Sequence, residues 1–126
     1  MKWSVVAWGF WPVAVLAACL SERPRPAPPT ISIALNKTTV ESRSPPDTLI
    51  VNVRAADPDG LDSVWVQLAN SPPVGADGLF DDVLEGPFRV IVPPGLPQGS
   101  VLPVTVRARD VVGFETERDS TVRVGP

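Results

Sequence analysis

The 126-residue chain contains no histidine and no tyrosine, and its single cysteine is Cys19. Without histidine there is no imidazole to act as a general base or metal ligand, and one cysteine can form neither an intramolecular disulfide nor a thiolate metal site. The segment "FDDVLE" at 80–85 offers carboxylates, but nothing around it indicates a substrate cleft. We therefore expect that the protein is not an enzyme and predict no catalytic residues.

Basic residues are also fewer than acidic ones. The chain has 14 acidic against 11 basic residues, a formal net charge of −3. A net negative charge disfavours binding to nucleic acids and to anionic lipid surfaces. We predict no nucleic-acid partner.

The first twenty residues carry one charge, on Lys2, and then an uncharged run from Val5 to Leu20 that is interrupted by Gly9 and Pro12. A transmembrane helix needs about 20 apolar residues, and a proline within so short a run makes a spanning helix unfavourable. A basic start, a short apolar core and small residues at its end are instead typical of a cleaved secretory signal.

The run ends in Leu-Ala-Ala-Cys at 16–19, which resembles the lipobox of bacterial lipoproteins. The resemblance implies that residues 1–18 are a signal peptide and that Cys19 is lipidated, with chains such as palmitate, as the first residue of the mature protein. A thiolate suits this alkylation because it is a strong nucleophile, and two or three acyl chains anchor firmly. Leu20, where an aspartate would resemble an inner-membrane retention signal, favours the outer membrane over the inner one. The alternative is an ordinary signal peptide in which Cys19 is merely a small apolar residue.

The next segment, "LSERPRPAPP" at 20–29, has four prolines in ten residues. Such a segment favours extended polyproline II conformation and spans roughly 30 Å. Residues 19–29 are therefore expected to be a lipidated cysteine followed by a proline-rich linker that lifts the next domain off the membrane.

From Thr30 onward the apolar residues alternate with a period of two, and no stretch shows a helical period. The alternation predicts half-buried antiparallel strands, separated by clusters of Pro, Gly and Asp. With a short, weaker strand near Leu79 to Leu84, the count reaches seven. The strands are expected in "TISIALN", "TLIVNVRA", "SVWVQLA", the weak segment, "PFRVIV", "VLPVTVRA" and "STVRV". We predict an all-β fold, a single seven-stranded β-sandwich over 30–126.

Two of these segments repeat one another: "VNVRAADPDGL" at 51–61 and "VTVRARDVVGF" at 104–114. The chain resembles the immunoglobulin-like modules of bacterial surface proteins, with fibronectin type III and cadherin-like sandwiches as relatives. The resemblance implies that the two segments are strands B and F with the turns that follow them. Because no cysteine pair joins them, Val53 and Val106 are expected to hold the two sheets together by packing.

Four aspartates lie in or near these two turns: Asp57, Asp59, Asp62 and Asp110. In an immunoglobulin-like sandwich the turns after strands B and F lie at the same end, so these carboxylates can converge. Two interpretations are open. Aspartate commonly stabilises a turn by accepting hydrogen bonds from its own backbone, whereas a convergent cluster of carboxylates suits calcium. A calcium-dependent or small-ligand binding domain is therefore the alternative to a purely structural or binding module.

Three loops each contain a pair of adjacent prolines, and the pairs include Pro45, Pro72 and Pro94. Because successive strands alternate in direction, these loops are expected at the end of the sandwich opposite the aspartate turns. Rigid loops lose little entropy on binding, which suits recognition. Trp65 points outward by parity, either as a contact residue or as cover for a sheet edge. A partner, either an envelope protein or a surface polymer, is expected to contact the loops of Pro45, Pro72 and Pro94 or the sheet face of Trp65, while the membrane holds Cys19. The alternative is that the prolines only stiffen loops and protect strand edges.

Overall fold

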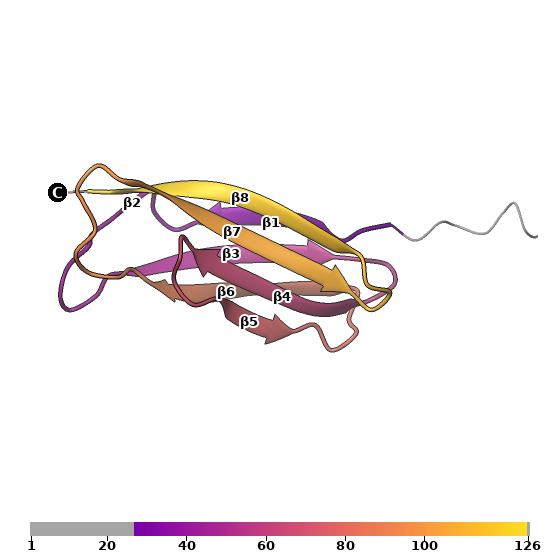
Figure 1. Cartoon of the computed structure of the whole chain (residues 1–126). Helices are drawn as coiled ribbons and strands as arrows, with labels where there is room; N and C mark the ends of the chain where they lie inside the picture. Colours follow the sequence, from indigo (N-terminus) through magenta and orange to yellow (C-terminus); the bar gives the residue numbers. More distant parts are fainter. Residues whose placement is uncertain (1–26, 126) are drawn as a thin grey trace, which may run out of the picture.

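The structure, a computed structural model, describes residues 27–125. These residues contain eight strands and no helix, so the predicted all-β fold is confirmed. The strands form a three-stranded sheet, in the order β1-β3-β6, and a five-stranded sheet, in the order β2-β8-β7-β4-β5 (Figure 1). Their bounds are β1 Thr30–Leu35, β2 Thr39–Val40, β3 Thr48–Ala56, β4 Leu61–Leu68, β5 Val74–Asp77, β6 Val83–Ile91, β7 Val101–Asp110 and β8 Glu115–Val124.

The alternation of side chains explains why the two sheets face one another. Along β3 the even-numbered Asn52 and Arg54 are exposed while the odd-numbered apolar residues are buried, and β7 buries its even-numbered apolar residues in the same way. Since β3 and β7 belong to opposite sheets, their buried faces meet in the core. The four central valines predicted for the core are confirmed as buried: Val51, Val53, Val104 and Val106.

The strand count differs from the predicted seven because of β2, a two-residue strand. β2 pairs in parallel with the end of β8, where the N–H of Gly125 also donates to the carbonyl of Val40 at 2.8 Å. The expectation of a wholly antiparallel arrangement was therefore wrong at this edge. Two residues are too short to display a period of two, so the sequence pattern could not reveal this strand.

The weak strand expected near Leu79 to Leu84 was also misplaced. The edge strand β5 lies earlier, at Val74–Asp77, inside a segment that reads as a proline-rich loop. Residues 78–82 form a turn, and β6 begins at Val83 rather than at Pro87. Proline is tolerated within β6 because β6 is the edge strand of its sheet.

Strand direction assigns the connections to two ends of the sandwich. The turns at 57–60, 78–82 and 111–114 share one end, which we call the acidic end. The start of β1 lies there too, because Thr30 pairs with Ala56, the residue before Asp57. The loops at 36–47, 69–73 and 92–100 lie at the opposite end, the proline-loop end (Figure 1).

Candidate functional site: an acidic cluster between two turns

The turn after β3 and the turn after β7 bring three aspartates together. A hydrogen bond from the N–H of Val111 to the carbonyl of Gly60, at 3.0 Å, joins the two turns directly. Carboxylate oxygens of Asp57, Asp59 and Asp110 lie within 4.8 Å of one another. The convergence expected for the two repeated segments is thus present for three of the four aspartates.

The repeat in the sequence corresponds to a repeated turn. In each turn the aspartate carbonyl accepts from the N–H of the glycine three residues later, Asp57 from Gly60 at 3.1 Å and Asp110 from Gly113 at 3.2 Å. Both glycines have positive φ, +100° and +108°, a conformation that other residues rarely adopt. The D-x-x-G spacing in both segments is therefore the requirement of one backbone geometry.

One oxygen of each buried aspartate is used by its own turn. Oδ1 of Asp57 accepts from the N–H of Asp59 at 2.7 Å. Oδ1 of Asp110 accepts from three successive backbone N–H groups, those of Val112, Gly113 and Phe114, at 3.0, 2.7 and 2.8 Å. The turn interpretation thus accounts for both Oδ1 atoms.

The second oxygens, Oδ2 of Asp57 and Oδ2 of Asp110, are buried and have no hydrogen-bond partner among the described residues. Each of the two residues is only 1 % exposed. Burial raises the pKa of the Asp57 carboxyl, and the adjacent Asp110 carboxyl raises it further, against the N–H of Asp59, which lowers it. Two ionised carboxyl groups that are buried in contact repel one another strongly, because burial removes the screening of bulk solvent.

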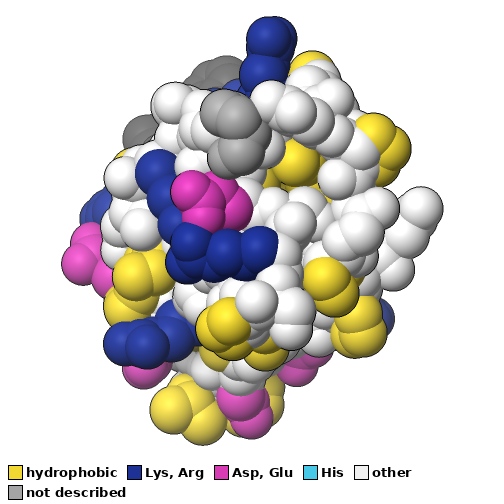
Figure 2. Space-filling view, turned by 90° about the vertical axis from the view of Figure 1, so that its left-hand side faces the viewer, with side chains coloured by type: hydrophobic (Ala, Val, Ile, Leu, Met, Phe, Trp, Pro, Cys, Tyr) yellow, Lys and Arg dark blue, Asp and Glu magenta, His cyan; other side chains and the backbone are white. Residues whose placement is uncertain are grey.

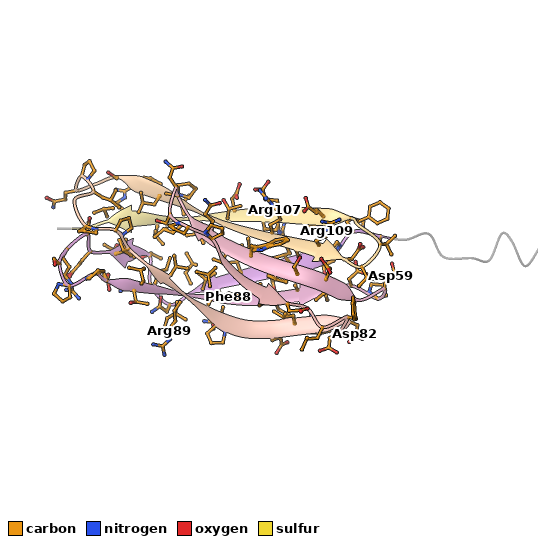
Figure 3. The ribbon with its side chains drawn as sticks, turned by 60° about the horizontal axis from the view of Figure 1, so that its bottom comes forward. Asp59, Asp82, Phe88, Arg89, Arg107 and Arg109 are labelled. Atoms are coloured by element: carbon orange, nitrogen blue, oxygen red, sulfur yellow. The ribbon has the colours of Figure 1, made fainter. Side chains whose placement is uncertain are left out.

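The other two aspartates are solvent-exposed, and only one of them belongs to the cluster. Asp59 lies at the tip of the turn after β3, at the acidic end (Figure 3). Asp62, the fourth predicted residue, points away from the cluster on β4, where its Oδ2 accepts from the hydroxyl of Ser63 at 3.2 Å. A bulge in the pairing of β4 with β7 separates Leu61 from Ser63 and places Asp62 outside the regular register.

The turn at 78–82 packs on the same end and was not singled out by the sequence pattern. Its backbone pairs with the acidic turn: the N–H of Asp57 donates to Asp82 and that of Leu61 to Asp81, both at 2.8 Å. Around the cluster, apolar side chains are exposed to solvent. This apolar rim consists of Leu79, Phe80, Val111, Val112 and Phe114.

At the proline-loop end, two of the three loops are held to one another. The hydroxyl of Ser42 donates to the carbonyl of Pro93 at 2.7 Å and accepts from the N–H of Leu96 at 2.8 Å, which ties the loop of Pro45 to that of Pro94. A groove of about 420 Å³ runs between the loop of Pro94 and the turn that joins β4 to β5. It is lined by Leu68, Ser71, Pro72, Pro93, Leu96 and Leu102. Figure 2 views this end and shows hydrophobic side chains, proline included, scattered between basic and acidic groups. Pro45, Pro72 and Pro94 are all exposed.

Trp65 is half-buried on the outer face of β4 rather than fully exposed. Its ring covers the backbone of Gly75 on the edge strand β5: a Cβ at Gly75 would lie only 2.8 Å from Cδ1 of Trp65. The contact favours a role in covering the sheet edge. The rest of the ring borders a shallow hollow with Gln67, Thr105 and Arg107.

Lys37, an ordinary strand-end residue by its sequence context, forms an ion pair that sequence reasoning missed. Its Nζ lies 2.7 Å from Oδ1 of Asp47, and the Asp47 side chain also accepts from the N–H groups of Glu41 and Thr48. The hydrogen bond from Lys37, with those backbone donors, lowers the pKa of the Asp47 carboxyl to about 2. No sequence motif marks the pair, because its members lie ten residues apart in a loop.

The predicted signal peptide, Cys19 and most of the linker lie outside the described residues. Within residues 27–125, no helix is long and apolar enough to cross a membrane. Comparison with protein-family models, with curated proteins and with solved structures finds no match.

Proposed function

We propose that this chain is a lipid-anchored protein of the bacterial cell envelope, in which an immunoglobulin-like sandwich serves as a binding module without enzymatic activity. The sequence Leu-Ala-Ala-Cys at 16–19 supports lipidation of Cys19 and, with Leu20 after it, the outer membrane as the site of anchoring. The placement of β3 and β7 in opposite sheets, each followed by the same turn, supports their correspondence to strands B and F.

The observation that carries the proposal is the polarity of the sandwich. The chain enters β1 at the acidic end, so a tether attached through residues 19–29 holds that end towards the lipid. With a linker of roughly 30 Å, the proline-loop end is the part of the domain that extends furthest from the membrane. A partner in the envelope therefore meets the loops of Pro45, Pro72 and Pro94 first.

The proline-loop end also has the physical properties of a recognition surface. Ser42 connects two of the three loops, and the amide of Gln67 donates to the carbonyl of Ser71 at 3.0 Å, which fixes the third. Loops already held in one conformation lose little entropy on binding. The apolar groove between them suits a protein partner, because a few side chains seated in such a groove carry much of the binding energy.

The anchor is tested with Cys19→Ala. Cells expressing the wild-type chain and the variant are fractionated, and the membrane and soluble fractions are compared for amount and processing. The proposal expects the variant to leave the membrane fraction and to keep its unprocessed length. A variant that stays membrane-bound and is processed as the wild type contradicts it.

The recognition surface is tested separately from the anchor. One variant replaces the proline pairs of the three loops with Gly-Ser, and a second carries Trp65→Ala; partner capture from the native envelope and melting temperature are measured for both. Loss of capture by the loop variant at unchanged melting temperature supports a protein partner at the proline-loop end. Full capture by both variants contradicts that placement and moves the contact to the acidic end with its apolar rim. Loss of capture after digestion of envelope polymers, and not after protease treatment, identifies a polymer instead.

A further inference from the structure

We propose that Asp57, Asp59 and Asp110 form a binding site for a hard divalent cation, Ca²⁺, which is held by Oδ2 of the two buried carboxylates and by the exposed carboxylate of Asp59. The site lies within the sandwich domain and does not depend on the anchor or on the partner proposed above.

Turn stabilisation does not explain the whole cluster. The backbone N–H groups of the two turns bind the Oδ1 atoms only. The Oδ2 atoms of Asp57 and Asp110 are buried and without a partner, and they come from turns that a hydrogen bond between Val111 and Gly60 holds together. An unsatisfied buried carboxylate oxygen costs free energy, so two such atoms at one point indicate a group that they bind.

The chemistry of the site selects the ligand. All three groups offer oxygen, which hard cations such as Ca²⁺ prefer, and three carboxylates provide the negative charge that balances a divalent ion. Two oxygens bound to one Ca²⁺ at about 2.3–2.6 Å are at most about 5 Å apart. One carboxylate oxygen from each of Asp57, Asp59 and Asp110 lies within 4.8 Å of the others. Mg²⁺ fits less well, because it demands a near-ideal octahedron with bonds of about 2.0–2.1 Å, whereas Ca²⁺ accepts longer bonds and a flexible geometry from ligands on two separate turns.

Asp59 is the proposed ligand that can be changed without disturbing the buried pair. Its side chain is exposed, so its replacement leaves no buried group unpaired.

The test uses the full chain purified in detergent, stripped of divalent ions at pH 7 and titrated with calcium chloride, with melting temperature and calorimetric binding as readouts. Extracellular calcium modules bind with dissociation constants of about 0.1–1 mM, so 10 mM calcium is expected to raise the melting temperature by on the order of 5–15 °C. Magnesium chloride at the same concentration is the ionic control and is expected to give a much smaller shift.

Two single variants remove the same charge at different places. Asp59→Asn removes a proposed ligand and is expected to weaken calcium binding at least about tenfold while leaving the apo melting temperature close to that of the wild type. Asp62→Asn is the matched control, because Asp62 lies nearby but outside the cluster, and it is expected to bind calcium as the wild type does. No shift with wild-type protein up to 10 mM calcium overturns the proposal. Equal weakening by both variants also overturns it, because it means that calcium responds to overall negative charge rather than to this site.

Discussion

The substitution Asp57→Asn is expected to stabilise the calcium-free protein at pH 7. Asparagine keeps a side-chain oxygen that can accept from the N–H of Asp59, as Oδ1 of Asp57 does at 2.7 Å. Its amide N–H₂ then faces the buried Oδ2 of Asp110, which lacks a partner in the wild type. A repulsive contact between two carboxyl groups is thus replaced by a hydrogen bond to a charged acceptor. Such a bond contributes about 1.5–3 kcal/mol when well formed, and we expect a net gain of about 1–2 kcal/mol.

The direction of the Asp57 pKa adds a pH dependence to this prediction. Because the folded-state pKa of Asp57 is raised above 3.8, the native state keeps the carboxyl proton over a pH range in which the unfolded chain has released it. The stability contributed by that proton is fully present below pH 3.8 and is lost as the pH rises through the folded-state pKa. The calcium-free wild type should therefore gain stability on acidification from pH 7 towards pH 4, and Asp57→Asn should not.

The assay is denaturant unfolding at several pH values, with chelator present. A variant that is less stable than the wild type at pH 7 would refute the repulsive contact between the two carboxyl groups. A wild type whose stability does not change between pH 7 and pH 4 would refute it as well. In 10 mM calcium the order should reverse, because the variant has lost a proposed ligand.

The remaining predictions concern the core, the turns and the Lys37–Asp47 pair, each measured by denaturant unfolding. Val53→Ala should cost about 1–3 kcal/mol, since the side chain is only 3 % exposed between the sheets, and a cost near zero would contradict its role there. Gly60→Ala should cost at least about 1 kcal/mol more stability than Gly113→Ala. Both glycines have positive φ, but a Cβ at Gly60 would lie 2.7 Å from a backbone oxygen, whereas a Cβ at Gly113 meets nothing within 4 Å. Equal costs would contradict this contact at Gly60. The pKa of Asp47 is lowered, so the stability that its ionised carboxylate contributes is present above pH 3.8 and is lost as the pH falls through about 2. Lys37→Met should reduce this loss of stability in acid by at most about 2 kcal/mol. The figure is an upper limit because the Lys37 side chain is 33 % exposed.

The fold could be predicted from the sequence wherever strands bury one face. In β3 and β7 the alternation of apolar and polar residues is long enough to give both the strand and the face that it buries. The edge strands gave no such signal. β2 has two residues, and β5 contains Gly75 and follows two prolines, so neither has a run of large apolar side chains to alternate. Edge strands bury less, and therefore their sequences are less constrained by the core.

The candidate site was only partly predictable for a related reason. The D-x-x-G spacing of the two repeats predicts two similar turns, and the resemblance to immunoglobulin-like modules implies that they share an end. The sequence could not separate Asp62 from the cluster, because the bulge between Leu61 and Ser63 changes the register just there. Nor could it reveal the apolar rim: Leu61 and Phe114 close the two repeats at matching positions, yet Leu61 is fully buried and Phe114 is 43 % exposed.

The two oxygens of each buried aspartate differ in their partners, and this difference distinguishes the candidate site from a common turn motif. An aspartate that only stabilises a turn can leave its second oxygen in water at no cost, as an exposed residue does. Asp57 and Asp110 instead keep Oδ2 buried without a partner among the described residues, and their two carboxyl groups are neighbours. The two turns meet because β3 and β7, which belong to opposite sheets, finish at the same end of the sandwich, where the hydrogen bond from Val111 to Gly60 joins the turns that follow them. Val53 and Val106 are buried in the core along these two strands. A substitution that loosens the core near the acidic end should therefore weaken calcium binding as well as stability.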